Sequence, residues 1–578
     1  MPLPCGFVVK NGTKRLVGSD DCGLKRTTSA PHVGVRIVRA ITRMDRNPQS
    51  SRQPRDSRPR PSGPGPRPPQ QPGGRSGSAP PPSGSNRPAP ERRAEPRPVP
   101  LQVKSGVPHG ATESGWYPDW VYTGEKFESG VAFFADAVGR ITRFSREPAD
   151  LALARRLAGQ AVLPGLVNAH SHTFQRVLRG RGGSRGRGER DLRSGLREAH
   201  DRALARLGAE DVFDTARMVF LEMLLSGVTC VGEFHYLHHQ PDGSPSPEPG
   251  FLAREVMRAA HDVGIRIVLL NVLSLRPERQ ADAPGAGASS AAISPDRFRS
   301  ASVDQFLRET EALRVVVEKT FPADEVSLGV GAYSLAHVPL DAFKALATYA
   351  RAQRLRLHAH VSTTAAENAA CAAEFGRTPL ALLSEHGIVD KRFTAVDAVH
   401  LTTDEIALLG AARATVCVCP SSEYHAGLSS AAVEKLIVAG AGVALGSDGQ
   451  VQIDLLREAR LLDYALRTRP EGAVGLPGDA ATALFHAATV TGARSLGATS
   501  GALEVGRPAD FFTVNVFDPS LAGADVETLL AHVLYSLERR AIRDVWIGAR
   551  QRITGGRHPN HGPIVGRFVD VQKKIWGG

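Results

Sequence analysis

AVLPGLVNAHSH, residues 161–172, is a run of apolar and β-type residues that ends in two histidines. Seven similar runs follow it, and segments with helical spacing of apolar residues, such as 211–227 and 431–442, lie between them. Continuous apolar runs are typical of parallel strands buried on both faces. Eight such runs alternating with helices favour an α/β fold with a closed (β/α)₈ barrel of the TIM type. The predicted strands are residues 161–172, 228–236, 265–273, 326–334, 355–363, 393–401, 414–422 and 442–449.

Shorter strand-like segments flank the predicted barrel on both sides. Residues 120–144 alternate apolar and polar side chains around glycine turns, and similar segments follow the barrel. We therefore predict that the barrel occupies residues 161–500. The flanks, residues 116–160 and 501–578, then form a small composite β-sandwich domain, the second flank together with a C-terminal segment.

The first part of the chain has a different composition. Residues 1–100 hold 19 of the 71 Lys and Arg residues but only 6 of the 59 Asp and Glu residues, which leaves 52 basic and 53 acidic groups elsewhere. Residues 51–100 also contain 16 of the 41 prolines. Such a segment buries too little apolar surface to offset chain entropy, so we predict that residues 1–115 are a disordered, basic, Pro/Arg-rich tail. Nucleic acid is not expected to bind the core, whereas weak binding by this tail is an open alternative.

Composition also limits the cellular setting. The sequence has no run of the roughly 18 to 20 apolar residues that a membrane helix requires, so we expect no membrane partner. The six cysteines are too few and too scattered for a disulfide framework. The first residues lack the pattern of a secretory signal. These features predict a cytoplasmic protein with a small-molecule substrate, and an apolar barrel exterior is compatible with a homodimer.

Metal-ligand residue types stand at the ends of three predicted strands. The first strand ends in His170 and His172, the fifth contains His358 and His360, and the eighth ends at Asp448. Working residues of such barrels lie at the carboxyl ends of the strands, and histidines at i and i+2 of a strand share one face. Three histidines with one aspartate suit Zn²⁺ or Fe²⁺ and leave one position for water. We predict one divalent metal ion, with zinc ahead of iron.

These motifs resemble the amidohydrolase superfamily, and within it the formimidoylglutamate deiminases, over about residues 117–570. The similarity is carried by LPGLVNAHSHTFQR, GEFHYLHH, LHAHV, GRTPLALLSEHG, AVHLTTDE, LGSD and HAATVTGARSLGATSGALEVGRPADFFTVN. The resemblance implies attack of an activated water on an amidine carbon with loss of ammonia. It implies a single metal ion held by His170, His172, His360 and Asp448.

The resemblance also assigns roles to individual residues. It implies that Asp448 takes up the proton of the attacking water, and that Gln175 and Tyr236 face the substrate. Both of these positions belong to the motifs that carry the similarity, HSHTFQR and EFHYLHH.

Four positions depart from the pattern of that family. The glutamate of its HxxE motif is Thr363, which has no usable pKa near 7 for proton transfer. The first histidine of VHATH is Asp397, whose charge would repel developing negative charge unless it were protonated or bound to metal. HSLR reads as Tyr333 to Ala336, so the arginine that would clamp a carboxylate is missing. SDSH ends in Gln450 instead of histidine.

Three interpretations follow. In the first, the chain is a metal-dependent hydrolase of a non-peptide carbon–nitrogen bond in another substrate, with Asp448, Asp397 or Tyr333 moving protons. Gln175, Tyr236 and Tyr333 would then contact the substrate. In the second, it is a catalytically silent homologue that binds metal or a small ligand. In the third, formimidoylglutamate deimination survives at a reduced rate. The retained ligand set favours the first interpretation, because a decaying site has no physical reason to keep all four ligands.

Overall fold

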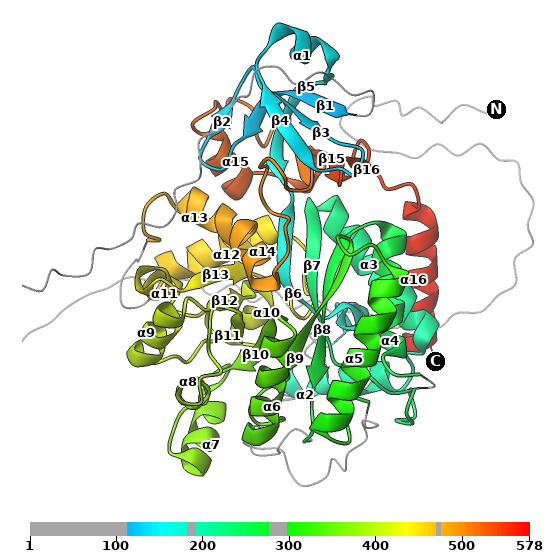
Figure 1. The fold of residues 1–578 in the computed structure, drawn as a ribbon, viewed down its shortest axis with the longest axis vertical. Helices are drawn as coiled ribbons and strands as arrows, with labels where there is room; N and C mark the ends of the chain where they lie inside the picture. The colour runs from blue at the N-terminus through cyan, green and yellow to red at the C-terminus, as the bar shows by residue number, and fades with distance from the viewer. Residues whose placement is uncertain (1–112, 182–191, 247, 277–296, 470–474, 578) are drawn as a thin grey trace, which may run out of the picture. The chain divides into compact units, whose positions relative to one another are not determined.

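The computed structural model describes residues 113–181, 192–246, 248–276, 297–469 and 475–577. All but the last three residues of the predicted disordered tail, 1–115, lie outside these ranges. The described residues form two sheets of eight strands each, together with the helices that surround them (Figure 1).

One sheet is the barrel. Its eight strands pair in chain order and are parallel throughout. The last strand returns to the first, because Ser171 and Asp448 form a parallel bridge and the Ser447 N–H donates to the His170 carbonyl at 2.9 Å. The predicted (β/α)₈ barrel is therefore confirmed. The strands are β6 (Leu166–Ser171), β7 (Val228–His235), β8 (Arg266–Leu273), β9 (Val326–Ala332), β10 (Leu357–Val361), β11 (Phe393–Asp397), β12 (Thr415–Val418) and β13 (Gly442–Leu445).

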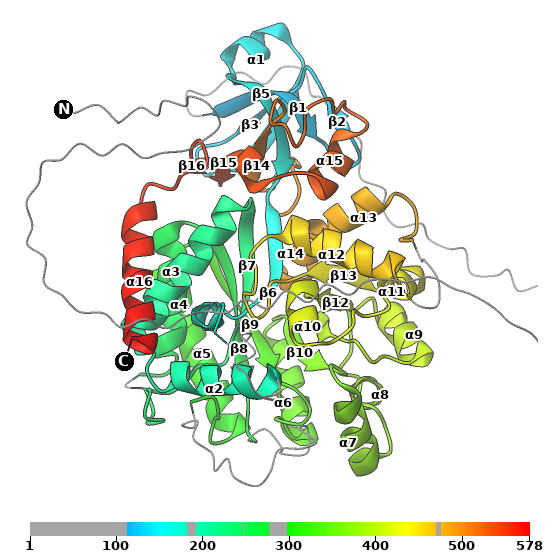
Figure 2. The same cartoon turned by 180° about the vertical axis from the view of Figure 1, so that it is seen from behind.

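Helices surround the barrel strands in both views (Figures 1 and 2). The predicted helix at 211–227 is α3 (Ala209–Leu225), whose apolar residues at three- and four-residue spacing are buried. The others are α2 (Leu192–Leu204), α4 (Phe251–Val263), α5 (Val303–Thr320), α6 (Leu340–Ala352), α7 (Ala365–Phe375), α8 (Pro379–Glu385), α9 (Thr403–Ala412), α10 (Pro420–His425), α11 (Val433–Ala439), α12 (Leu455–Arg467), α13 (Ala480–Ala487), α14 (Val490–Leu496) and α16 (His561–Trp576).

The second sheet combines both flanks of the barrel. Its main path is β16-β15-β14-β5-β1-β3-β4, and β2 pairs with β1. Trp116 contacts Phe133, Phe511 and Trp546, so aromatic residues from both flanks share one small core. The first flank supplies β1 (Ser114–Tyr122), β2 (Phe127–Glu128), β3 (Ala132–Ala135), β4 (Ile141–Ser145), α1 (Pro148–Leu153) and β5 (Arg155–Pro164). The second supplies β14 (Phe511–Asn515), α15 (Leu529–Tyr535), β15 (Ile542–Ile547) and β16 (Arg550–Ile553).

The predicted first barrel strand, 161–172, is two strands in the structure. Its first part belongs to β5 and pairs with β14 of the second sheet, and only β6 belongs to the barrel. Gly165 lies between the two strands and packs closely against the Thr229 side chain, so that a Cβ at this position would lie 2.1 Å from Thr229 Oγ1. What reads as one apolar run is therefore two strands that meet at a glycine. The second sheet lies at the end of the barrel where its strands begin (Figure 1).

None of the helices within the described ranges is both long enough and apolar enough to span a membrane.

Candidate active site

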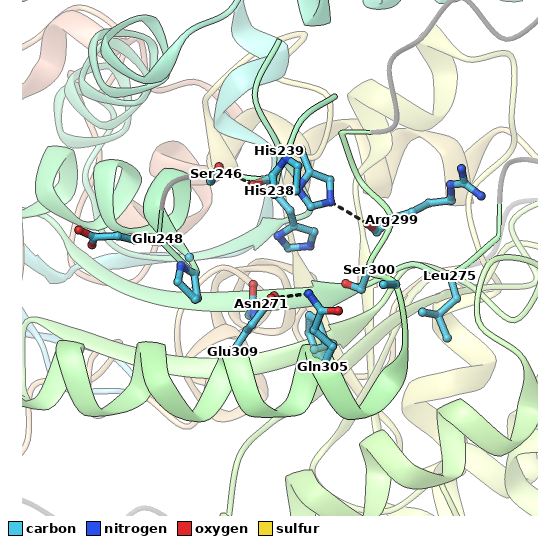
Figure 3. A pocket seen from close by; sticks show the side chains of 15 residues that line it. His238, His239, Ser246, Glu248, Asn271, Leu275, Arg299, Ser300, Gln305 and Glu309 are labelled. Atoms are coloured by element: carbon cyan, nitrogen blue, oxygen red, sulfur yellow. Dashed lines mark hydrogen bonds between the residues drawn. The ribbon is translucent and has the colours of Figure 1, made fainter. Parts of the chain in front are cut away.

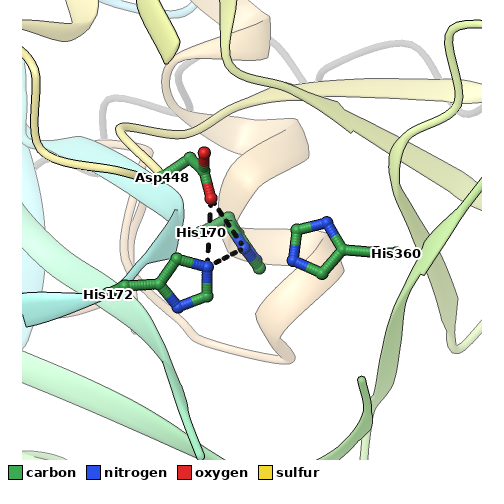
Figure 4. Close-up of side chains that lie close together, drawn as sticks. All are labelled: His170, His172, His360 and Asp448. Atoms are coloured by element: carbon green, nitrogen blue, oxygen red, sulfur yellow. Dashed lines mark hydrogen bonds and ion pairs between the residues drawn. The ribbon is translucent and has the colours of Figure 1, made fainter. Parts of the chain in front are cut away.

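Four side chains converge at the carboxyl ends of the barrel strands (Figure 4). His170 and His172 come from the end of β6, His360 from β10, and Asp448 from the segment after β13. One ligand atom of each lies within 4.8 Å of those of the others. The two Nε2 atoms of His170 and His172 are 3.1 Å apart, and Asp448 Oδ1 lies 3.0 Å from His172 Nε2. Residues almost 280 positions apart thus share one small volume.

The tautomers of two histidines are set by their second nitrogen atoms. His172 Nδ1 donates to the Phe234 carbonyl at 2.9 Å, and His360 Nδ1 donates to Asp397 Oδ2 at 2.9 Å. In a neutral imidazole the other nitrogen, Nε2, then carries a lone pair. A lone pair of His172 aimed at a carboxylate oxygen 3.0 Å away is repulsive unless a cation or proton lies between them. The donor set therefore fits a divalent metal ion.

Charge and burial favour the ligand forms of the remaining two residues. Burial lowers the pKa of His170 well below its ordinary value, so this imidazole is neutral. Burial alone would raise the pKa of Asp448, but its interactions with His170 and His172 hold that pKa well below the usual range. Burial lowers the pKa of His360, yet the attraction of Asp397 outweighs it and the net pKa is raised. Such a partner also makes the imidazole a more basic ligand.

Glu233, near the end of β7, fixes the backbone around the paired histidines. Its carboxylate accepts hydrogen bonds from Ser171 Oγ at 2.6 Å, from the Thr173 N–H at 2.6 Å and from Thr173 Oγ1 at 2.7 Å. Glu233 is only 1% exposed, and burial raises its pKa while the three donors oppose this. His172 lies between the two anchored residues, so Glu233 fixes the main chain on both sides of this histidine.

Gln450, the residue at the departure from SDSH, joins the last barrel strand to the first. Its Nε2 donates to Ser171 Oγ at 2.8 Å, and its Oε1 accepts from Ser447 Oγ at 3.1 Å. Ser447 in turn pairs with Asn168, whose Nδ2 donates to Ser447 Oγ at 2.8 Å. These contacts form a buried chain of polar side chains next to the four clustered residues, and Gln450 is one of its members.

Backbone strain is concentrated at the same strand ends. Among the described residues, eight that are not glycine have positive φ, and five of them are at this site. These five are Ser362, Asp397, Ala398, Asp448 and Gln450, with φ between 37° and 66°. Each such residue costs about 1–3 kcal/mol and persists only where the surroundings hold it, which is typical of active sites.

Asp397 and Thr363, two other departures from the family pattern, lie beside His360. Asp397 Oδ2 accepts from both His360 Nδ1 and Thr363 Oγ1, the latter at 2.8 Å. Asp397 is not one of the four clustered residues. Glu367, one helical turn after Thr363, accepts from the Thr363 N–H at 2.8 Å, and burial raises its pKa to about 7.

Gln175, Tyr236 and Tyr333, predicted to contact the substrate, surround the cluster. Gln175 Nε2 donates to the Tyr236 hydroxyl at 2.7 Å. The Tyr236 ring lies 5.1 Å from the His172 ring and 5.1 Å from the Tyr333 ring. Burial raises the pKa of Tyr236 well above its ordinary value, so its hydroxyl stays protonated. His337 completes this wall, since its ring lies 4.5 Å from that of Tyr333.

Other histidines of the motifs lie elsewhere. His358 is two residues deeper in β10 than His360, and its Nε2 donates to the Ser495 carbonyl at 3.1 Å. His238 and His239 line a separate cavity of about 400 Å³ between the segment after β7 and α5, together with Asn271 and Gln305 (Figure 3). None of the four clustered residues lines this cavity.

Three residues of the site were not predicted from the sequence. Glu233 lies within the quoted GEFHYLHH motif, and its alternation with His235 along β7 was a usable signal. His337 lies on a turn after β9, and Glu367 lies in the first turn of α7, where the spacing from the strand does not show which way a side chain points. Only the folded chain shows that they approach His360 and its neighbours.

The fold and this site define a class: barrel hydrolases that hold a divalent metal ion between strand ends. Comparison of sequences assigns the family, because the model of the amidohydrolase family matches residues 161–556. The chain is 34% identical over 423 residues to the formimidoylglutamate deiminase of Pseudomonas aeruginosa, covering 72% of this chain and 90% of that protein. This chain belongs to the amidohydrolase family.

Further relatives agree with this assignment. The chain is 28% identical over 395 residues to a 5-methylthioadenosine/S-adenosylhomocysteine deaminase of Moorella thermoacetica, covering 65% of this chain and 78% of that protein. The crystal structure of an amidohydrolase from Brucella melitensis matches with a TM-score of 0.71 and 25% identity, covering 80% of this chain and 99% of that one. The predicted resemblance to the amidohydrolases is confirmed.

Proposed function

We propose that this hydrolase removes ammonia from an amidine or a related C–N group of a small molecule, with His170, His172, His360 and Asp448 as the ligands of one divalent ion. The convergence of three imidazoles and one carboxylate at the barrel mouth carries this proposal. Zinc is the first choice and iron the second, because mixed nitrogen and oxygen ligands suit both.

A bound divalent ion would supply Lewis-acid activation of water for hydrolysis at this mouth. The protein's own groups then place the reactants. Asp448 points Oδ1 into the cluster, and its Oδ2 accepts the proton of the attacking water. The Tyr236 hydroxyl, oriented by Gln175, donates to the substrate, since its raised pKa keeps it protonated. Thr363 holds no proton that it can give up near pH 7.

The wall of the site supports a planar substrate group. Tyr236 and Tyr333 meet edge to face at 5.1 Å, with His337 against the second ring. Burial lowers the pKa of His337 to about 4, so this ring is neutral near pH 7. Uncharged aromatic faces pack against planar amidines and heteroaromatic rings. The Pseudomonas aeruginosa and Moorella thermoacetica relatives are named for removing such nitrogen groups.

The experiment combines metal analysis with ammonia release. The purified chain is expected to hold one equivalent of zinc or iron, and to release ammonia from N-formimino-L-glutamate, 5-methylthioadenosine or S-adenosylhomocysteine. Asp448→Asn should abolish the release. Metal binding with no ammonia from any of the three, and a ligand-dependent rise in melting temperature, would instead favour a silent binding protein. Absence of metal in both purified and zinc-treated protein would refute the proposal.

We place the enzyme in the cytoplasm as part of the same proposal. The four cysteines within the described ranges are all buried and unpaired, as is typical of proteins from reducing compartments. Cell fractionation tests this location. A homodimer and weak nucleic-acid binding by the tail are also proposals, which size-exclusion chromatography and salt-dependent binding by the full chain would test.

A further inference from the structure

Two side chains that replace family acid–base residues contact each other. Thr363 follows β10 and Asp397 ends β11, and the Thr363 hydroxyl donates to Asp397 Oδ2 at 2.8 Å. His360 Nδ1 donates to the same oxygen atom at 2.9 Å. One carboxylate oxygen therefore receives two hydrogen bonds, one from a metal-ligand residue and one from the threonine.

The backbone is built to hold this contact. Asp397 has φ of 66° and is the centre of a three-residue turn, in which the Ala398 N–H donates to the Val396 carbonyl at 3.0 Å. Ser362, next to Thr363, has φ of 54°, and its carbonyl accepts from the His400 N–H at 2.9 Å. Such conformations are unfavourable for residues other than glycine. Both strand ends are strained where they meet, so their geometry is fixed jointly.

Helix α7 adds a support on the threonine side. The Thr363 N–H donates to Glu367 Oε2 at 2.8 Å, while the Glu367 N–H donates to Thr364 Oγ1 at 3.1 Å. These contacts cap the start of α7 and hold the main chain of Thr363 against it. The Thr363 hydroxyl is thereby left to face Asp397.

We propose that Asp397 and Thr363 are a coupled pair of positioning residues for His360. Asp397 holds the imidazole through Nδ1 so that Nε2 faces the metal site, and Thr363 holds the Asp397 carboxylate. This inference rests on the proposed function, because it assumes that His360 is a metal ligand. Histidine ligands commonly donate their second N–H to a carboxylate, which fixes both the tautomer and the ring orientation.

The pair changes how the two departures from the family are understood. Taken separately, each removes an acid–base group. Taken together, they create one hydrogen-bonded unit, in which each residue supplies the partner of the other. With Oδ2 occupied by two donors, Asp397 serves as a fixed acceptor, and proton transfer falls to Asp448.

The test measures Zn²⁺ affinity by competition with a chromophoric chelator, using the full chain. Asp397→Asn keeps the shape and tolerates positive φ, but it is expected to weaken Zn²⁺ binding about 10- to 100-fold. Thr363→Val should weaken Zn²⁺ binding by a smaller factor. Thr363→Ser keeps the hydroxyl and should bind Zn²⁺ as tightly as wild type. In the double variant Asp397→Asn/Thr363→Val, the affinity should equal that of Asp397→Asn alone, since coupled residues are not additive.

A second readout and matched controls separate positioning from folding. The visible spectrum of the Co²⁺-loaded protein should change in Asp397→Asn, because the geometry around the ion changes. Thr403→Val and Asp404→Asn, on the exposed start of α9, carry the same chemical changes away from the site and should leave both readouts unchanged. Circular dichroism of metal-free protein shows whether each variant folds.

The outcomes distinguish the two proposals. If wild-type protein binds Zn²⁺ and Asp397→Asn binds it within about twofold, the positioning proposal is overturned and the proposed function stands. The same holds if the effects of the two single variants multiply in the double variant. If wild-type protein binds neither Zn²⁺ nor Fe²⁺, the proposed function fails, and the positioning proposal fails with it.

Discussion

The side chain of Gln450 donates to Ser171 Oγ at 2.8 Å, across 279 positions of the chain. Ser171 lies between His170 and His172 on β6, and Gln450 follows Asp448 by two residues. This contact therefore ties the segment that carries Asp448 to the end of β6 beside His170 and His172, all three of them proposed metal ligands. The glutamine that departs from the family pattern thus adds a side-chain bridge to the backbone contacts that close the barrel here.

Gln450→Leu tests this role. The substitution removes one hydrogen bond from each of two buried hydroxyls: Ser171 keeps Glu233 as its acceptor, whereas the Ser447 O–H loses the acceptor that Gln450 provides. We therefore expect the free energy of unfolding to fall by about 1–3 kcal/mol. Zn²⁺ affinity should fall as well, because the Asp448 segment loses its support. Urea unfolding measures the first effect. Gln353→Leu, an exposed change at the end of α6, should stay within about 0.5 kcal/mol of wild type. Equal free energies of unfolding for the two variants would show that the hydrogen bonds of Gln450 do not stabilise the fold.

Glu233→Gln probes the anchor beneath the paired histidines. A neutral amide offers one acceptor oxygen where three donors from Ser171 and Thr173 now meet a carboxylate, and its NH₂ group faces a donor. We expect a loss of about 2–4 kcal/mol in stability and a weaker metal site, measured by urea unfolding and Zn²⁺ titration. Glu504→Gln, in the exposed ion pair with Arg507, is the matched control and should change stability little. An unchanged Zn²⁺ affinity in Glu233→Gln would show that the hydrogen bonds of Glu233 do not affect metal binding by the clustered residues.

The strand ends could be predicted from sequence because buried parallel strands read as apolar runs, and a barrel brings their carboxyl ends together. The choice of His360 over His358 came from the family resemblance, since both lie on one face of β10. The structure gives the physical reason. His358 lies two residues, roughly 6–7 Å, further from the mouth, where it donates to the Ser495 carbonyl instead.

The contact between Thr363 and Asp397 could not be predicted. The two residues are 34 positions apart, and Asp397 is the centre of a turn with positive φ, which no apolar pattern encodes. For the same reason the sequence suggested a repulsive charge at Asp397, whereas two donors surround it. The division of 161–172 at Gly165 could not be predicted either, because the run is apolar on both sides of the glycine, and the packing of Thr229 against Gly165 exists only in the folded chain.

His235 predicts a dependence of stability on pH. Its side chain is 3% exposed, and burial lowers its pKa from 6.5 to about 3. The folded protein keeps this histidine neutral while the unfolded chain protonates it, so its contribution is complete above pH 6.5 and is lost as the pH falls toward 3. His235→Phe removes the titration. Between about pH 7.5 and pH 5, the variant should gain about 2 kcal/mol relative to wild type in urea unfolding. If the free energy of unfolding changes with pH in the same way in both proteins, this prediction is wrong.

Gln175 and Tyr236 should act as a unit on the substrate. Gln175 Nε2 donates to the Tyr236 hydroxyl at 2.7 Å. If either side chain is removed, the other loses the hydrogen bond that orients it. We expect Tyr236→Phe and Gln175→Leu each to lower kcat/KM for ammonia release about tenfold, and the double variant to fall no further. Tyr349→Phe removes a comparable hydrogen bond, from the Tyr349 hydroxyl to Glu311 Oε2 at 3.0 Å on the outer helices, and should leave kcat/KM unchanged. Zn²⁺ affinity should be the same in all four variants, because none of the three residues belongs to the proposed ligand set. Multiplicative losses in the double variant would mean that the two side chains contact the substrate independently.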